Sequence, residues 1–294
     1  QISGKWRFIS NFRDQWIGPA SPYATGTVSF DSKVMQEKMG DNNTFGIGGM
    51  MLYDHVMQGA LKSASISLNS SYNVVLSSGD ITHRLGIGVG GIFANKRVDY
   101  SKLNFGEQFN GYGFDTNLPT GESALSQMKP YLSASAGVLY SVSTDYSNID
   151  IGVAGYHLNK PKQSVLEDPN QFLAPRYVGH ANFETYLNTE LVLNTNAIYQ
   201  RQSTTSYVSV GGALGYFLTG DPEDIVLSAG VWYWSKNAVI PYIGVSYQNM
   251  QFGLTYDITV SKLSRAEEKP KSFELSIIIR GTNRNKGVIW CPWK

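Results

Sequence analysis

The strongest constraint on the fold is a two-residue alternation of apolar and polar side chains, clearest between Ala64 and Ser77. Successive side chains of an extended strand point to opposite faces, so one face here is largely apolar and the other carries Ser and Asn. A face this polar does not line an ordinary protein core. Either it meets water on a single-layer sheet, or it lines a wet lumen while the apolar face meets lipid. Because the pattern recurs along the chain, the sequence predicts a transmembrane β-barrel.

Composition agrees with a lipid-facing barrel. Charged residues make up 16% of the 294 residues, against about 25% in typical soluble domains. The chain also has 18 Tyr and 6 Trp, many near predicted strand ends, where barrel girdles place amphipathic rings. The alternative is that Tyr simply favours strands. A net charge of +1 argues against a nucleic-acid partner, and the single cysteine excludes an internal disulfide.

Fourteen segments carry the strand pattern, and an even number lets both chain ends lie in the periplasm. We expect one barrel domain over residues 1–294, with strands between about residues 4 and 281, a periplasmic tail at 282–294, and a signal peptide already removed. The alternation assigns Ile66, Leu68, Val138, Val210, Leu254 and Ile277 to lipid. The predicted strands are 4–13, 23–32, 44–54, 62–77, 83–95, 130–142, 147–157, 176–187, 190–201, 205–218, 224–235, 238–248, 250–261 and 271–281.

The connectors between the predicted strands give a second signal. When they are numbered along the chain, short and long connectors tend to alternate. Most even-numbered connectors are tight-turn sequences, whereas the odd-numbered ones include the two longest, 96–129 and 158–175. Only the second connector, 33–43, breaks the rule. Outer-membrane barrels have short periplasmic turns and long extracellular loops, and a soluble β-sandwich has no reason to sort its loops this way. The sequence therefore predicts two long extracellular loops.

Charged residues within predicted strands must face the lumen or lie at a rim, since Arg or Lys at the lipid midplane costs about 2–4 kcal/mol. One interpretation is a polar channel or a surface that grips a peptide. The other, which we favour for most members, is a mutually neutralised network that fills the barrel. The predicted lumen charges are Arg13, Asp31, Asp54, Arg84, Glu190, Arg201, Asp257 and Glu274.

No motif points to catalysis or to a cofactor. Residues 86–91 match G-x-G-x-x-G, but they lie inside a predicted strand rather than at a strand-to-helix turn, so we interpret these glycines as lumen-facing positions that leave room for a bulky neighbour. The four histidines are scattered without metal-ligand spacing, and no G-x-S-x-G elbow is present. We therefore expect no enzyme activity, no metal and no cofactor.

Two regions are candidates for partner binding. The long loops carry aromatic residues that either fold into the barrel mouth or bind a protein. The tail combines basic residues with an aromatic group, a mixture that is common in protein interfaces. For the tail, the alternative is that it folds back to close the periplasmic mouth. The candidate residues are Phe105, Phe109, Tyr112, Phe114 and Phe172 in the loops, and Trp290, Cys291, Pro292 and Trp293 in the tail.

Several segments, in their order and spacing, resemble the PorP/SprF family of type IX secretion outer-membrane proteins. They are Arg13–Trp16, Thr27–Asp31, Phe45–Asp54, Pro175–Tyr177, Phe273–Ser276 and Cys291–Pro292. The resemblance implies a non-enzymatic outer-membrane component of type IX secretion and gliding machinery. It implies as partners the periplasmic ring components or a secreted surface adhesin with a type B C-terminal targeting domain. Outer-membrane lipid and lipopolysaccharide are the expected surroundings.

The alternative function is a diffusion channel or a hydrophobe transporter of the fatty-acid type. Such a transporter needs a plug before the barrel and an apolar groove, whereas the predicted strands begin at residue 4. We therefore expect the secretion role rather than transport.

Overall fold

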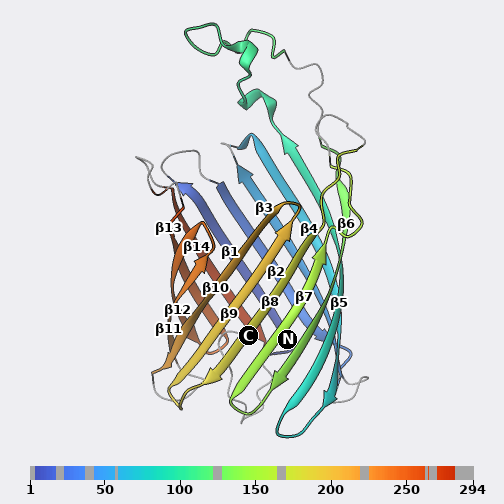
Figure 1. The fold of residues 1–294 in the computed structure, drawn as a ribbon, viewed down its shortest axis with the longest axis vertical. Coiled ribbons are helices and arrows are strands. Elements are labelled where there is room, and N and C mark those ends of the chain that lie inside the picture. Colours follow the sequence, from blue (N-terminus) through green and yellow to red (C-terminus); the bar gives the residue numbers. More distant parts are fainter. Residues whose placement is uncertain are drawn as a thin grey trace.

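The chain folds into a closed antiparallel barrel, as the alternation predicted. The computed structural model describes residues 4–17, 23–36, 43–56, 59–121, 128–163, 170–218, 225–261, 264 and 270–281. Strands β1 to β14 follow one another around the wall in chain order (Figure 1). Each of the fourteen predicted strands overlaps an observed one. None of the helices in the described residues is long and apolar enough to cross a membrane.

The strand bounds agree with the predicted ones to within a few residues. The strands are β1 (Trp6–Ile17), β2 (Tyr23–Val34), β3 (Asn43–Val56), β4 (Leu61–Ser77), β5 (Thr82–Val98), β6 (Tyr131–Ser143), β7 (Ser147–Tyr156), β8 (Arg176–Tyr186), β9 (Leu191–Gln202), β10 (Thr205–Phe217), β11 (Val226–Trp234), β12 (Ala238–Tyr247), β13 (Met250–Thr259) and β14 (Lys271–Gly281). Two short 3-10 helices, η2 (Tyr100–Lys102) and η3 (Gly106–Gln108), lie in the connector between β5 and β6.

The barrel closes where the first strand pairs with the last. β1 is hydrogen-bonded to β2 on one side and to β14 on the other, with Arg13 opposite Glu274. A register shift between Asp14 and Ile17 marks a bulge at the end of this seam, where Trp16 has a φ of 66°. Closure leaves no sheet edge with unpaired backbone groups, which is what a hydrocarbon environment requires.

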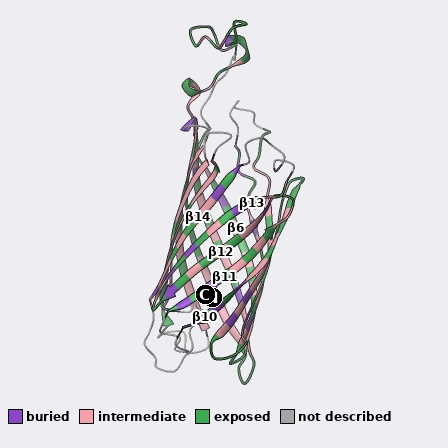
Figure 2. Ribbon diagram, turned by 90° about the vertical axis from the view of Figure 1, so that its left-hand side faces the viewer, coloured by how far each residue is buried: buried purple, intermediate pink, exposed green. Residues whose placement is uncertain are grey.

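Exposed and less exposed residues alternate along the strands, which Figure 2 colours by burial, because successive side chains point to the outer surface and to the lumen. In β4, Leu68 is 71% exposed on the outer face, while its neighbour Ser67 is 4% exposed on the inner face. The six side chains assigned to lipid are all exposed at outer-face positions. The predicted register of these strands is therefore confirmed.

The two long connectors leave the barrel at the same end. In Figure 1, the described parts of residues 99–130 and 157–175 lie at the upper end, and the turns 144–146 and 187–190 lie at the lower end. The ninth and eleventh connectors, 203–204 and 235–237, also lie at the upper end, yet they are tight turns. Parity therefore predicts where the long loops are, but not the length of every odd connector. Part of the tenth connector, 219–224, lies outside the described residues.

Only a small part of the interior is apolar. Val192, Phe217 and Val226 are at most 2% exposed and form one cluster on β9, β10 and β11. Tyr186 stacks on Phe217 with 6.1 Å between the ring centroids. Most other buried side chains of the described strands are polar, so hydrogen bonds and ion pairs are the main contacts inside the barrel.

Candidate functional site

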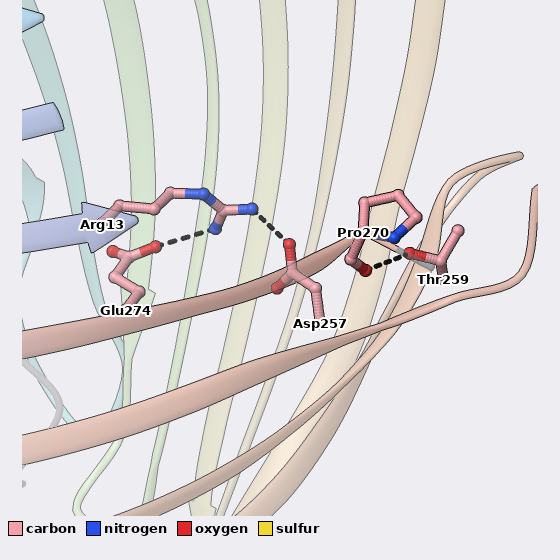
Figure 3. Close-up of polar contacts among 5 residues, drawn as sticks. All are labelled: Arg13, Asp257, Thr259, Pro270 and Glu274. Atoms are coloured by element: carbon pink, nitrogen blue, oxygen red, sulfur yellow. Dashed lines mark hydrogen bonds and ion pairs between the residues drawn. The ribbon is translucent and has the colours of Figure 1, made fainter. Parts of the chain in front are cut away.

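The lumen holds a charged cluster at the barrel seam (Figure 3). Arg13 donates from Nη1 to Oε2 of Glu274 at 3.0 Å and from Nη2 to Oδ2 of Asp257. Its guanidinium carbon also lies 5.9 Å from the ring centroid of Trp234. Three strands, β1, β13 and β14, supply the ionic members, and β11 supplies the ring. One cation thus bridges carboxylates from two neighbouring strands, which is the geometry of a structural clamp.

Other predicted lumen charges are also paired across neighbouring strands. Arg7 donates from Nε to Oδ2 of Asp31 at 3.1 Å. The hydroxyl of Thr25 donates to Oδ1 of Asp54 at 2.7 Å, and Arg84 donates to Oγ of Ser143 at 3.3 Å. Arg7 and Asp31 form an ion pair, whereas Asp54 and Arg84 bond to neutral hydroxyl groups of the barrel wall. All four side chains therefore bond to the wall, but only Arg7 and Asp31 neutralise each other.

Two of the predicted lumen charges, Arg201 and Glu190, lie at the rims instead, and the prediction is wrong for both. Arg201 is exposed and has the same parity in β9 as the outward-facing Tyr199. Its Nε lies 3.5 Å from the backbone oxygen of Ser203. Glu190 is exposed in the turn before β9, where its backbone N–H donates to Oδ1 of Asn188 at 2.8 Å. Water solvates both charges there, so neither needs a partner in the lumen.

A second lumen network, built around two half-buried aromatic rings, was not predicted. Trp232 donates from Nε1 to Oδ1 of Asn196 at 2.8 Å and packs edge-on against Tyr242 at 5.7 Å. Gln251 lies 3.4 Å from the Tyr242 hydroxyl and accepts from Arg280 at 2.9 Å. The alternation along β11 could have predicted this network, because Trp232 and Trp234 lie on the same face of the strand as the buried Ser228. The Tyr and Trp content predicts either girdles at the strand ends or a simple strand preference, and neither interpretation places these rings in the lumen.

The barrel interior contains a cavity of about 510 Å³ near the first eight strands. Arg7, Asp31 and Lys33 line it together with Ser and Asn side chains of β4. Gly86 and Gly90 also face the lumen, since a Cβ at these positions would collide with Oδ1 of Asn73 and Asn69 respectively. The predicted role of these glycines, room for a bulky neighbour, is therefore what the structure shows, and the strand position excludes a nucleotide loop.

The first long connector forms a compact tip with exposed aromatic rings. Phe109 and Phe114 pair with 5.3 Å between ring centroids, and their backbones form an isolated β-bridge. Oδ1 of Asn110 accepts from the backbone N–H groups of Tyr112 and Gly113 at 3.0 Å. This turn holds Tyr112 fully exposed, at 102%, while Phe109 and Phe114 are 53% and 54% exposed.

The predicted loop residue Phe105 serves a different purpose from the tip aromatics. It is half-buried and precedes η3, where its backbone N–H donates to Oε1 of Gln108 at 3.1 Å. Gln108, only 5% exposed, donates in turn to the backbone oxygen of Leu118 at 3.1 Å. Gln108 therefore ties the base of the tip together, a role that sequence reasoning missed.

The second long connector carries Phe172 near the barrel mouth. Phe172 is 51% exposed and forms an isolated bridge with Lys162, whose Nζ lies 5.9 Å from the ring centroid. At the start of the connector, Nδ1 of His157 lies 2.7 Å from Oγ of Ser133 in β6. Burial, followed by the charges of Arg176 and Lys96, lowers the pKa of His157 below its ordinary value of 6.5. A neutral imidazole thus fastens this connector to the barrel wall.

The structure brings Phe109, Tyr112 and Phe114 together, whereas Phe172 lies on the separate second connector. The predicted tail residues Trp290, Cys291, Pro292 and Trp293 lie outside the described residues. Among the described residues, no group of three His, Cys, Asp or Glu side chains is placed to hold a metal ion.

Solved structures show the same architecture at low sequence identity. A Pseudomonas aeruginosa FadL homologue has 10% identity and a TM-score of 0.52, covering 93% of this chain and 89% of that one. The CymD monoaromatic hydrocarbon channel has 9% identity and a TM-score of 0.52, with coverage of 96% and 90%. A deletion mutant of the TodX monoaromatic hydrocarbon channel has 9% identity and a TM-score of 0.53, with coverage of 93% and 88%. At these identities the likeness shows the fold alone.

The sequence identifies the family more specifically than the fold does. No protein with a curated description matches the chain. The sequence model for the type IX secretion system membrane protein PorP/SprF matches residues 1–279, nearly the whole chain. Together with the barrel fold, this match places the protein in the bacterial outer membrane. The resemblance noted in the sequence is confirmed: the chain belongs to the PorP/SprF family of type IX secretion system membrane proteins.

Proposed function

We propose that this protein is a non-enzymatic component of type IX secretion that binds a secreted surface protein through its first long connector, on the outer side of the membrane. The observation that carries the proposal is the aromatic tip, defined as Phe109, Tyr112 and Phe114. The first long connector, which carries these residues, extends beyond the barrel end (Figure 1). The three rings remain exposed although the loop is ordered by its own hydrogen bonds.

An ordered loop that leaves large rings in water is suited to protein recognition. Tyr and Phe supply wide contact area, and a preformed loop loses little conformational entropy on binding. The secreted protein with a type B C-terminal targeting domain is the partner that the family implies.

Co-purification from detergent-solubilised outer membrane tests the proposal. We expect the Phe109→Ser/Tyr112→Ser/Phe114→Ser variant to lose the surface protein, while the barrel still shows heat-modifiable gel mobility. The matched control is Tyr146→Ser, because Tyr146 is 69% exposed in a short turn at the other end. Retention of every partner by the triple variant would contradict the proposal.

A second candidate function is a diffusion channel, which the cavity of about 510 Å³ inside the barrel favours. Planar-bilayer recording distinguishes the two. A steady large conductance from the purified protein supports the channel, and an electrically silent barrel supports the binding role.

A further inference from the structure

Three basic residues form a row on the outer face of the barrel. His55 in β3, Lys62 in β4 and Arg97 in β5 are direct register partners in neighbouring strands. They have the parity of the outward-facing side chains Tyr53 and Phe93, and Lys62 and Arg97 are exposed. The row lies where these strands meet the connectors at the long-loop end.

The barrel wall is hollowed directly below this row. The next outward positions toward the middle of the barrel are Gly26, Tyr53, Ala64 and Asn95, and the next row is Val28, Met51, Ile66 and Phe93. These residues line a groove of about 520 Å³. A second hollow of about 370 Å³ shares Gly26 and Tyr53 with it and reaches His55 and Lys62. The groove is therefore continuous with the basic row.

Small residues form the floor of the groove, and large residues form its sides. A Cβ at Gly26 would have no heavy atom within 4 Å, so open space lies above that position. Tyr53 and Phe93, each 49% exposed, stand on either side of the short Ala64 side chain. A wall of this shape and apolar character fits an extended hydrocarbon chain.

Two cations, Lys62 and Arg97, lie side by side in the row. Neither Lys62 nor Arg97 forms an ion pair with a residue that the structure describes. Two carboxylates flank the row. Asp14 is separated from His55 by Ala24. Asp99 accepts from Oγ of Ser101 at 2.6 Å and also interacts electrostatically with Lys62 and Lys102. The neighbouring lumen charges point to the other side of the wall. Lys62 and Arg97 are both exposed and form no short ion pair with a described residue, so an anion at the membrane surface can reach them.

We propose that this surface binds a phosphorylated glycolipid of the lipid A class, with a phosphate on Lys62 and Arg97 and an acyl chain in the groove. Charge complementarity selects an anionic headgroup, and basic side chains at the membrane surface interact favourably with lipid phosphates. The apolar groove selects a ligand whose acyl chains continue from that headgroup. The inference rests on the outward orientation of the long connectors that the proposed function also requires.

Native mass spectrometry of the purified full chain in neutral detergent tests the proposal. The probes are bisphosphorylated lipid A, dephosphorylated lipid A and phosphatidylglycerol, each added at equal concentration. We expect one bisphosphorylated lipid A to be retained in preference to the other two. In Lys62→Gln/Arg97→Gln its affinity should fall by roughly tenfold or more, because each basic residue near a lipid surface contributes appreciably to binding.

Two further variants make the result specific. Gly26→Phe should fill the groove and weaken lipid A binding while leaving Lys62 and Arg97 in place. Arg201→Gln is the matched control, since it removes an outward-facing charge at the same end of the barrel, and it should bind as the wild type does. If a variant fails to fold, the lipid preference of the wild-type protein still tests the proposal.

The outcomes separate this inference from the proposed function. Equal retention of all three probes by the wild type, or unchanged affinity in Lys62→Gln/Arg97→Gln, would overturn the lipid site and leave the loop proposal standing. A preference for phosphatidylglycerol that the same variant abolishes would identify an inner-leaflet site, and would overturn both the lipid A assignment and the outward orientation.

Discussion

Arg13 in β1 donates a hydrogen bond of 3.0 Å to Glu274 in β14, so residues 261 positions apart in the chain fasten the seam that closes the barrel. Asp257 in β13 shares the same guanidinium. Their side chains are 20%, 31% and 7% exposed respectively, so the cluster is shielded from most solvent.

Removing the cation should therefore destabilise the barrel more than removing the whole cluster. Arg13→Met leaves two carboxylates facing each other, and we expect it to lower the free energy of unfolding by about 3 kcal/mol. The triple variant Arg13→Met/Asp257→Asn/Glu274→Gln should regain most of that loss, because no unpaired charge remains. Urea unfolding in lipid vesicles measures both. Equal unfolding midpoints for the wild type and Arg13→Met would show that the seam does not depend on this clamp.

The register predicts unequal penalties at two neighbouring positions of β13. Leu254 is 40% exposed on the outer face, so Leu254→Arg should impair folding into bilayers by about 2–4 kcal/mol if the side chain lies near the midplane. Thr255 faces the lumen opposite Glu274, so Thr255→Arg places its charge beside a carboxylate and should cost much less. Similar losses at both positions, measured by the same unfolding assay, would rule out the register.

The sequence predicted the strands and the faces of their side chains well, because the alternation of apolar and polar residues within each strand identifies its lipid face and its lumen face. Leu68 and Ser67 show this directly, with opposite exposures at adjacent positions. Arg201 and Glu190 were misplaced because a charge near a strand end can reach water from either face. The contact between Arg13 and Glu274 could not be predicted, since it depends on how far the first and last strands are staggered when the barrel closes. The basic row of His55, Lys62 and Arg97 was missed because it depends on the register between β3, β4 and β5, whereas alternation reports only the two faces of each single strand.

The orientation of the barrel can be tested by labelling cells. In a Cys291→Ser background, cysteines at Asn110 and Asn170 should react with an impermeant maleimide on intact cells, because both residues lie in exposed parts of the long connectors. A cysteine at Asp80, in the turn between β4 and β5, should react only after lysis. Labelling of Asp80→Cys on intact cells, with neither loop position reacting, would invert the topology.

The attachment of the second long connector should weaken in acid. The folded state lowers the pKa of His157, so the unfolded or detached state binds the proton more readily. The stabilising contribution is therefore complete above the ordinary pKa of about 6.5 and is lost as the pH falls below it toward the lowered value. The protection factors of the backbone amides in residues 157–163, which are hydrogen-exchange rates corrected for the intrinsic pH dependence of exchange, should fall between pH 7.5 and pH 5. In His157→Gln this loss of protection should disappear, and its persistence there would assign the effect to another group.

The tail remains a candidate for a separate partner on the opposite side. Deleting residues 284–294 should leave barrel assembly and heat-modifiable mobility unchanged, while a periplasmic component no longer co-purifies. The prediction follows from the basic and aromatic composition of the tail, with Trp290 and Trp293 as the expected anchors. A truncated chain that does not assemble would instead assign the tail to the barrel, and one that keeps every partner would remove its binding role.

The central claim, that the aromatic tip contacts a secreted surface protein, is tested most directly by crosslinking in living cells. A photoreactive phenylalanine analogue at Tyr112 probes the tip, and the same analogue at Tyr146 probes the opposite end of the barrel. Both side chains are exposed, at 102% and 69%, so access to the probe is comparable. The account predicts an adduct between position 112 and a secreted surface protein, with none from position 146. An adduct with that protein from position 146 alone would contradict it.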